Sequence, residues 1–588
     1  MSKTHNSTPG TVTPQGSMEE VQDGAQLFEA KPEIAGNQDY LLTGNTDGLQ
    51  RSLTNRKVQL SAIGASIGTA LFLSIGGVLV KAGPASLFLA FVVYNIFLAM
   101  LNNCIAEMVT YMPVSGGFIR LAGKWVDDAL GFMVGWNFFL YQVVLIPFEI
   151  TALGMVLSYW SDNIPVGAIC GGCILLYGLL NAFTVKVYGE SEFWLSGGKV
   201  ILLFILLSFT FITMVGGNPQ HDAFGFRYWR SPGAFAEYSS TGMRGQFEGF
   251  LAALWAASFT CVGPEFVSIV AAEAKHPRVY IKTAYKVVFV RILVFYIGSA
   301  IAVGILVPHN EPTMTAIFNG ETGNSGSAAA SPYIIAMGNL GIGVLPHIIT
   351  ALITTTIFAA GNSVTYYGIR SLYGLSIEGR APKFLRKTTK QGVPIYCVLV
   401  VMVFPFLSFL QMSSGSTQVL DWLIDLATGC TIVSYIVIAI TYICFHRATV
   451  AQNFDRKSLA YRGWLQPYCA WLALIWEILI ITFYGYKSFS PFNIGTFFTH
   501  YAMVILMPIL FFGWKYTKGS KWLKPEEVDL VWDAPYITAY EEAATDRPTS
   551  LLHITSLATA VKEVAQTPAK TLTARQPPRT TRPPWPGL

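Results

Sequence analysis

The chain has 588 residues, of which 12% are charged and 52% hydrophobic, and its formal net charge is +5. Soluble domains carry about 25% charged residues, so this composition excludes an ordinary soluble protein and predicts a surface that meets lipid. The small net charge, spread over loops, gives nucleic-acid binding little support. The eight cysteines fall in or near apolar stretches, which favours buried helix residues over a metal or redox site. We therefore expect no metal and no cofactor.

Both ends of the chain are polar. Residues 1–55 are rich in Ser, Thr, Gly, Asp and Glu, and residues 519–588 become polar and Pro-rich. Such composition predicts a disordered N-terminal tail and a largely disordered C-terminal tail. The N-terminus lacks a charged segment followed by a short apolar run, so no cleavable signal peptide is expected. Residues 56–518 form the predicted membrane domain.

Twelve apolar runs approach the length of about 20 residues that a spanning helix needs. The sequence therefore predicts an all-α membrane protein with 12 transmembrane helices. The runs cover residues 58–80, 85–108, 132–159, 166–185, 193–215, 250–272, 287–307, 338–363, 395–411, 420–445, 465–484 and 496–514. An even number returns both termini to one side. Lys and Arg gather in alternate connections, together with both tails, which places the termini in the cytoplasm.

Two of these runs are interrupted in mid-span. The first contains GASIGTALF, with Gly64 and Gly68, and the sixth contains FTCVGPEF, with Gly263 and Pro264. A broken helix in lipid must face protein or a watery cavity, and matched breaks in two halves indicate a transporter site. Freed N–H groups there suit an anion and freed carbonyls a cation, as an amino acid zwitterion requires. Glycines that only permit close helix packing are the alternative.

Four ionisable residues lie within the predicted spans and are functional candidates by default. Glu149 and Glu265 are read as proton carriers, partners for a substrate ammonium, or partners for internal cations. Lys199 either extends to the cytoplasmic interface or is a buried amine that gains and loses a proton. Arg291, near the start of its run, is interpreted as an interfacial anchor. Outside the spans, Glu107 and Glu273 sit at helix ends, where loop ion pairs or gates are expected.

Several motifs occur in an order that resembles the fungal amino acid permeases of the amino acid–polyamine–organocation superfamily. They include GASIGTALF, AEMVTYMPVSGGF, GESEFWLSGGKV, VGPEFVSIVAAEAKHPR and GIRSLYGLSIEGRAPK. The resemblance covers about residues 53–516, and KPEEVDLVWDAP in the tail is most similar to the dicarboxylic amino acid permease branch. It implies a five-plus-five inverted-repeat transporter core with two extra helices. It also implies proton-coupled symport of L-amino acids at the plasma membrane, without a cofactor.

The resemblance further implies roles for individual residues. The substrate carboxylate would meet the first break, and a second half-site would include Phe259 as an aromatic gate. Lys199 matches a lysine that occupies the space of a sodium ion in related proton-driven carriers, and Glu265 joins it as a candidate for proton coupling or gating. The partners implied are an amino acid, a proton, the lipid bilayer, and trafficking and ubiquitin machinery at the tails. The substrate-binding candidates are Ser66, Ile67, Gly68, Thr69, Phe259, Thr260, Gly263 and Glu149.

Two departures from the family pattern bear on the substrate. Ala70 stands where the family usually has a second Gly, and Glu149 would repel a second carboxylate. The sequence therefore does not distinguish acidic from neutral amino acids as the substrate. A non-transporting amino acid sensor of the same fold is the alternative function, although such relatives tend to carry longer N-terminal tails. No HExxH cluster or nucleophile–base spacing is present, so no enzymatic activity is expected.

Overall fold

The computed structural model describes residue 51 and residues 53–161, 163–183, 185–318, 331–389, 393–414, 416–489 and 492–544. The chain divides into two compact units, Met1–Arg547 and Pro548–Leu588, and only the first contains described residues. The regular secondary structure of these residues is helical, apart from two isolated bridges, Leu53 with Ala274 and Phe489 with Phe492. The predicted disorder of residues 1–55 lies outside the described residues except at residues 51 and 53–55, and that of residues 519–588 lies outside them except at residues 519–544.

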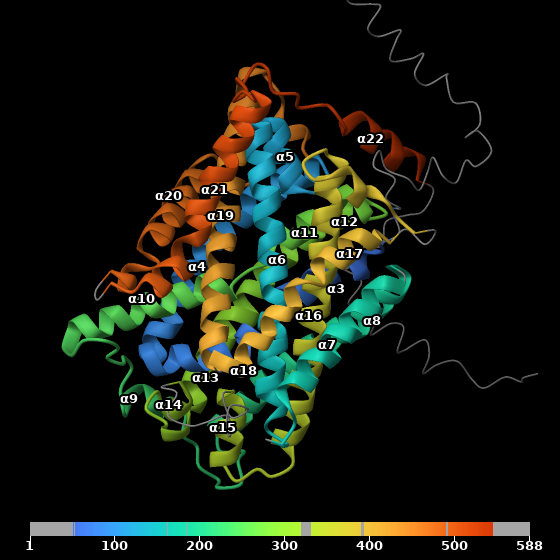
Figure 1. Ribbon diagram of the computed structural model, residues 1–588. Coiled ribbons are helices and arrows are strands. Elements are labelled where there is room, and N and C mark those ends of the chain that lie inside the picture. Colours follow the sequence, from blue (N-terminus) through green and yellow to red (C-terminus); the bar gives the residue numbers. More distant parts are fainter. Residues whose placement is uncertain are drawn as a thin grey trace, which may run out of the picture. The chain divides into compact units, whose positions relative to one another are not determined.

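Ten helices in the described part of the chain are long and apolar enough to cross a membrane (Figure 1). They are α4 (Ser74–Tyr111), α6 (Asp128–Leu157), α8 (Val185–Met214), α10 with α11 (Gly242–Thr260, Pro264–Ile269), α12 with η4 and α13 (Pro277–Arg291, Ile292–Ile297, Gly298–Leu306), α16 (Leu345–Ile377), α17 with η7 and α18 (Ile395–Val401, Phe404–Leu410, Gln411–Ser414), α19 (Ser416–Ala451), α20 (Tyr468–Phe483) and α21 (Ile494–Lys518). The all-helical membrane fold is confirmed, but the count of 12 is not.

The difference from 12 arises at two places. The fourth predicted run forms α7 (Val166–Phe183), whose apolar stretch Val166–Ala182 is shorter than each of the ten candidate spans. The first forms α3 (Asn55–Ser66), a 3₁₀ turn η2 (Thr69–Leu71) and the beginning of α4. Gly83 has φ of 76° and divides α4 just before Pro84. A Cβ atom on Gly83 would lie 2.6 Å from the backbone nitrogen of Ala236, so only glycine fits this bend.

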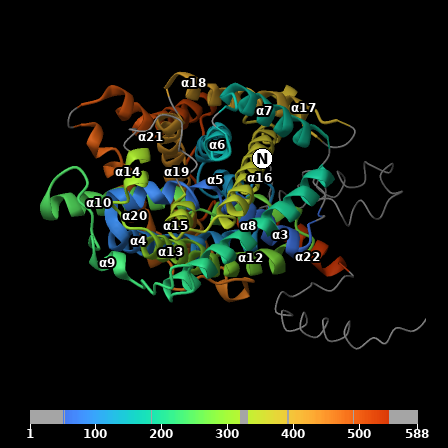
Figure 2. The same cartoon turned by 90° about the horizontal axis from the view of Figure 1, so that it is seen from below.

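Burial separates central helices from peripheral ones. In the most apolar stretch of α6, 83% of the residues are buried, against 11% in α21. A helix that is apolar all round can face either protein or lipid, and these fractions place α6 in the core and α21 at the periphery. Figure 2, which looks along the bundle, shows α6 between α16 and α19, the two helices that it contacts most.

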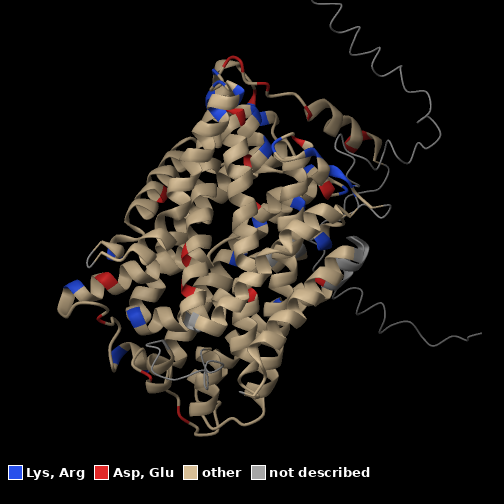
Figure 3. Ribbon diagram, viewed as in Figure 1, with Lys and Arg blue, Asp and Glu red and all other residues tan. Residues whose placement is uncertain are grey.

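Shorter helices lie at the ends of the bundle. One end carries α5 (Phe118–Trp125) and α22 (Ala534–Ala543), and the other carries α9 (Arg227–Arg230), α14 (Pro312–Phe318) and α15 (Pro332–Asn339). Lys and Arg are concentrated at the α5 end and sparser at the α14 end (Figure 3). This distribution is the pattern that distinguishes cytoplasmic from external loops.

The part of the C-terminal tail that the structure describes packs against the α5 end. Tyr111 donates its hydroxyl to the backbone oxygen of Leu530 over 2.8 Å, and the Trp125 indole donates to that of Asp529 over 3.1 Å. Arg278 donates to the hydroxyl of Thr538 on α22 over 2.8 Å. Residues 519–544 therefore hold the ends of several spans together.

Candidate functional site

The first break separates α3 from η2. α3 ends at Ser66, and Ile67 and Gly68 then adopt extended backbone conformations before η2 begins at Thr69. Ile67 is fully buried, as is nearly all of Thr69. The helix therefore ends inside the protein, where its last carbonyls and the first N–H groups of the next turn need partners other than water.

The second break lies between α10 and α11. α10 ends at Thr260, Gly263 has φ of 148°, and α11 begins at Pro264. The positive φ requires glycine, and a Cβ atom added to Gly263 would come within 3.3 Å of the Ser66 Cβ. The two breaks, nearly 200 residues apart in the sequence, therefore touch each other in the fold.

Two side chains from the seventh predicted span tie the breaks together. Arg291 donates to the backbone oxygen of Ala62 over 3.0 Å and to the hydroxyl of Ser66 over 2.9 Å. Tyr296, in the π-helical segment η4, donates to the backbone oxygen of Val262 over 2.5 Å and lies 3.4 Å from that of Ser66. The interpretation of Arg291 as an interfacial anchor is wrong, because its side chain is buried and its Nη1 atom donates to the last turn of α3.

Glu149 lies on α6 and faces the first break. Its carboxylate accepts a hydrogen bond from the hydroxyl of Thr69. A Cβ atom on Gly68 would lie 3.3 Å from the Glu149 Oε1 atom. The carboxylate is only 4% exposed, so it belongs to the inside of the break rather than to a loop or an interface.

Lys199 lies on α8 and points at the end of α3. Its ammonium donates to the backbone oxygen of Gly64 over 2.6 Å, and the residue is fully buried. Extension of this side chain to the cytoplasmic interface is therefore excluded. Of the two alternatives for Lys199, the structure agrees with the buried amine.

Glu192 is a buried carboxylate that the sequence analysis did not single out. Its Oε1 atom accepts from the hydroxyl of Ser196 over 2.6 Å, whereas its Oε2 atom is buried without a hydrogen-bond partner. It precedes Lys199 by two helical turns, which places both residues on one face of α8. That spacing in GESEFWLSGGKV is the signal by which the sequence could have revealed it.

Glu265 occupies a separate position at the start of α11. Its Oε2 atom accepts from the backbone N–H of Gly263 over 3.2 Å and from the hydroxyl of Tyr435 on α19 over 3.1 Å. It thus binds a free N–H group at the beginning of the helix. The contacts of Glu265 join it to α19, whereas those of Glu149 and Lys199 join them to the first break.

Phe259 and Thr260 lie at the end of α10. The Phe259 ring packs edge-on against Phe148, with ring centroids 5.3 Å apart, beside Glu149 in the sequence of α6. The hydroxyl of Thr260 donates to the backbone oxygen of Ala256 over 2.8 Å, within its own helix. Phe259 therefore borders the region between the breaks, while the Thr260 hydroxyl is turned toward its own helix.

Comparison with known proteins identifies the family. A family model of amino acid permeases matches residues 57–525. This chain belongs to the amino acid permease family. A general amino acid permease of Saccharomyces cerevisiae is 42% identical over 492 residues, which cover 82% of this chain and 82% of that protein.

Other relatives carry names that describe different substrates. The dicarboxylic amino acid permease of Saccharomyces cerevisiae is 36% identical over 488 residues, covering 82% of this permease and 79% of its own length. The proline-specific permease of Emericella nidulans is also 36% identical, over 487 residues that cover 82% and 88% of the two chains. Membership of the family supports amino acid transport by a multi-pass membrane protein, and equal identities to these two relatives favour neither substrate class.

Proposed function

We propose that this permease is a secondary active symporter that imports an L-amino acid together with a proton across the plasma membrane by alternating access. The observation that carries the proposal is the placement of Lys199. Its buried ammonium is bound to the Gly64 oxygen at the end of α3, while the Glu149 carboxylate accepts from Thr69 on the other side of the same break. Two groups able to exchange a proton thus contact the two segments that flank the break, α3 and η2.

In this proposal the substrate binds between the breaks. Residues 66–69 face its carboxylate, and Gly68 and Thr69 offer N–H groups to it, because the N–H of Ile67 already donates to the Ile63 oxygen. The freed carbonyls near Gly263 accept its ammonium. Phe259 closes the site on the side of α10. Because Arg291 and Tyr296 already hold the breaks against each other, substrate has only to complete a preformed arrangement of backbone dipoles.

Proton exchange at Lys199 provides the coupling. A charged ammonium binds the Gly64 oxygen more strongly than a neutral amine does, so protonation strengthens the connection between α8 and α3. Loss of the proton weakens it and favours a conformation in which α3 has moved. A proton therefore biases the equilibrium between two conformations, which is what alternating access requires.

The proposed topology has 12 crossings in a five-plus-five inverted repeat with two further helices. It adds α7 and the broken first segment to the ten long helices. The matched breaks in the first and sixth crossings support the repeat. The concentration of Lys and Arg at the α5 end supports cytoplasmic termini (Figure 3).

Uptake of labelled amino acids into permease-deficient yeast cells tests the proposal. Cells expressing the chain should accumulate at least one of glutamate, glutamine, leucine, lysine or proline, faster at pH 5 than at pH 7.5. A protonophore should abolish accumulation. Uptake that depends on neither pH nor the protonophore would contradict the proposed coupling to protons. Binding without accumulation would favour the sensor, which the names of the relatives do not support.

A further inference from the structure

Glu192 and Lys199, both on α8, reach the same residue of the neighbouring helix α3 (Figure 2). The Lys199 ammonium donates to the Gly64 oxygen over 2.6 Å, and a Cβ atom on Gly64 would collide with the Glu192 Oε1 atom. The Cβ and carbonyl oxygen of one residue are about 3 Å apart, so the ammonium lies within about 8 Å of that carboxylate oxygen. Rotation about the bonds of these two long side chains is enough to bring their polar groups together.

The Glu192 carboxyl group is only half satisfied. Its Oε1 atom accepts from the Ser196 hydroxyl over 2.6 Å, whereas its Oε2 atom is buried and has no hydrogen-bond partner among the described residues. A buried carboxylate is costly unless its charge is paired and its oxygens accept hydrogen bonds. A proton on Oε2 removes the charge, so this oxygen is a natural place for a proton to bind.

The buried charges around the breaks also favour an extra proton. Among the described residues, three carboxyl groups and two cations are buried there: Glu149, Glu192, Glu265, Lys199 and Arg291. Arg291 interacts electrostatically with Glu265, and Lys199 with both Glu192 and Glu149. One of the two carboxyl groups beside Lys199 is therefore left without a counter-charge. Glu149 accepts a hydrogen bond from η2, so the free Oε2 atom of Glu192 is the better site for the proton.

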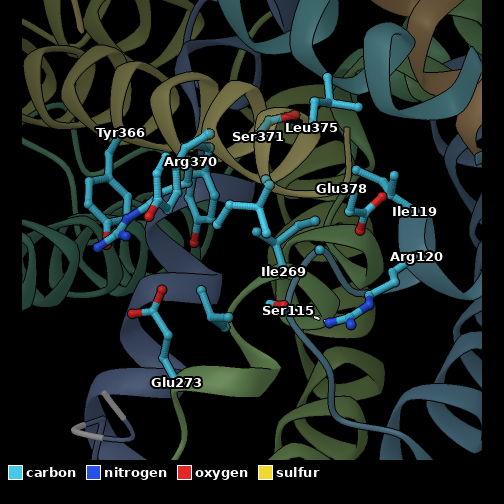
Figure 4. Close-up of a pocket in the computed structure, with 16 residues that line it drawn as sticks. Ser115, Ile119, Arg120, Ile269, Glu273, Tyr366, Arg370, Ser371, Leu375 and Glu378 are labelled. Carbon is cyan, nitrogen blue, oxygen red and sulfur yellow. Dashed lines mark hydrogen bonds between the residues drawn. The ribbon is translucent and has the colours of Figure 1, made fainter. Parts of the chain in front are cut away.

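Glu273 is another carboxyl group near the α5 end. It lines a pocket between α16 and the chain that follows α11, together with Arg370 (Figure 4). Arg370 interacts electrostatically with Glu273, so the charge of Glu273 has a partner there. None of the described residues that line this pocket comes from α8. Glu192, which shares a helix face with Lys199, is therefore better placed to exchange a proton with it.

We propose that Glu192 receives the proton of Lys199 and releases it to the cytoplasm. One N–H bond of the ammonium breaks, with its electron pair left on nitrogen, and an O–H bond forms at Oε2 of Glu192. An ion pair thus becomes a neutral amine and a neutral acid. Movement of α3 takes Gly64 away from the new acid and uncovers it, and the acid then loses its proton to water.

The direction of release follows from the position of Glu192 on α8. It lies two turns closer than Lys199 to Val185, where α8 begins, and the proposed topology puts that end on the cytoplasmic side. The role of Glu192 rests on the proposed function, since it requires a proton to accompany the substrate. Lys199 regains its charge when the next proton arrives from outside.

Net uptake and exchange by the purified permease in proteoliposomes separate this role from a structural one. The probe is whichever of labelled glutamate, glutamine, leucine, lysine and proline the cells accumulate. An imposed proton gradient drives net uptake, whereas exchange, with the same amino acid on both sides, needs no net transfer of protons. Glu192→Gln retains an oxygen for Ser196 but cannot take up a proton. Its net uptake should fall at least about tenfold, while its exchange stays within about twofold of the wild type.

Two further variants serve as controls. Glu192→Asp keeps a titratable group, so its net uptake should lie between those of Glu192→Gln and the wild type. Glu477→Gln makes the same chemical change in a fully buried carboxyl group on α20, and it should leave both measurements unchanged. Loss of exchange in Glu192→Gln would assign Glu192 a structural role. Glu192→Asp that is no better than Glu192→Gln, or an equal loss in Glu477→Gln, would also overturn the proposal.

The wild type distinguishes failure of this inference from failure of the proposed function. Net uptake by the wild type that does not respond to the proton gradient would contradict symport, and the role of Glu192 with it. Uptake that follows the gradient in the wild type and equally in Glu192→Gln would leave the symporter standing and refute the role of Glu192 alone.

Discussion

Lys199 donates a hydrogen bond of 2.6 Å to the backbone oxygen of Gly64, a carbonyl that the break in the first span leaves without its helical partner. In a continuous helix that oxygen would accept from the N–H of Gly68, but Gly68 is extended. The ammonium on α8 therefore replaces one hydrogen bond of α3. The break provides the buried Lys199 ammonium with a hydrogen-bond acceptor, and the ammonium satisfies the Gly64 carbonyl that the break leaves free.

Replacement of Lys199 should strongly impair transport. Lys199→Met removes the charge and the donor, and loss of a buried hydrogen bond to a charged group costs about 1.5–3 kcal/mol. We expect the initial uptake rate per molecule at the cell surface to fall at least about tenfold, since 1.4 kcal/mol is a factor of ten. Lys199→Arg should also fail, because a guanidinium keeps its proton.

Gly198→Ala is the matched control for these variants, since a Cβ atom at Gly198 meets nothing within 4 Å. It should leave uptake unchanged. Uptake by Lys199→Met that keeps its rate and its dependence on pH would show that Lys199 does not couple transport to protons.

Gly64 is required for the close approach of α3 and α8. A Cβ atom at Gly64 would collide with the Glu192 carboxylate and the Ser196 hydroxyl. Both side chains are buried on α8, so they would have to turn away from α3 and disturb the hydrogen bond between them. We expect Gly64→Ala to reduce uptake per surface molecule at least about tenfold, whereas Gly197→Ala, whose Cβ meets nothing within 4 Å, should not. Equal behaviour of the two variants would show that the contact with Glu192 is dispensable.

The positions of the breaks follow from local sequence, but their partners do not. Pro264 removes a helical hydrogen bond and clashes with the preceding turn, and the adjacent Gly263 permits a positive φ, so FTCVGPEF indicates the second break by itself. The apolar run that contains Arg291 begins at residue 287, which suggests an interfacial position. The helix α12, however, begins at Pro277, and Arg291 is the last of its 15 residues. Polar residues extend this helix beyond its apolar run, and hydropathy does not reveal that extension.

Glu192 and Tyr296 were not predicted as site residues, because their roles also depend on contacts between distant parts of the sequence. Tyr296 stands in an apolar run like many membrane tyrosines, and only the π-helical segment η4 and the approach of Val262 give its hydroxyl a role. The contact of Glu192 with Gly64 joins residues that are far apart in the sequence. Contacts of this kind depend on how the spans pack, so one sequence predicts the broken helices but not the side chains that connect them.

Glu107 forms the loop ion pair that was expected of it, and this pair should stabilise the fold. Its carboxylate, which is fully buried, lies 2.7 Å from Arg456, and it also accepts from the hydroxyl of Tyr442 over 2.9 Å and from the backbone N–H of Gly463 over 2.7 Å. Removal of one partner of a buried pair costs about 3–5 kcal/mol. Glu107→Gln and Arg456→Met should each lower the thermal unfolding midpoint in detergent, and the double variant should lose less than their sum. Additive losses would mean that the two residues act independently.

Asp127 should make the stability of the protein depend on pH. Burial raises the pKa of this carboxyl group, but hydrogen bonds from Lys515, Ser520 and the backbone of Ala129 outweigh that effect, so the pKa lies below its ordinary value. A group whose pKa is lower in the folded than in the unfolded state stabilises the fold above its unfolded pKa, which is about 3.9 for Asp. That stabilisation is lost as pH falls through the folded value.

The unfolding midpoint in detergent, measured from pH 6 to pH 3, tests this effect. Asp127→Asn, which keeps the shape but removes the charge, should lower the midpoint at pH 6 and reduce the difference between pH 6 and pH 3. Asp222 provides a control, because its carboxylate also has a lowered pKa through Arg227 but is exposed. Asp222→Asn should change the midpoint little. A midpoint with the same dependence on pH in Asp127→Asn and in the wild type would contradict the prediction.

Glu149 should determine whether acidic amino acids are accepted. Its carboxylate is buried beside Thr69 and Gly68, where the substrate is proposed to bind. Two negative charges about 4 Å apart repel each other by about 4 kcal/mol at an effective dielectric constant near 20. Glu149→Gln retains a side chain that can accept from Thr69 but removes that repulsion. In competition against a labelled neutral substrate, glutamate and aspartate should gain at least about tenfold relative to glutamine and leucine. A uniform change across the panel would mean that Glu149 acts on the break or the proton and does not face the substrate side chain.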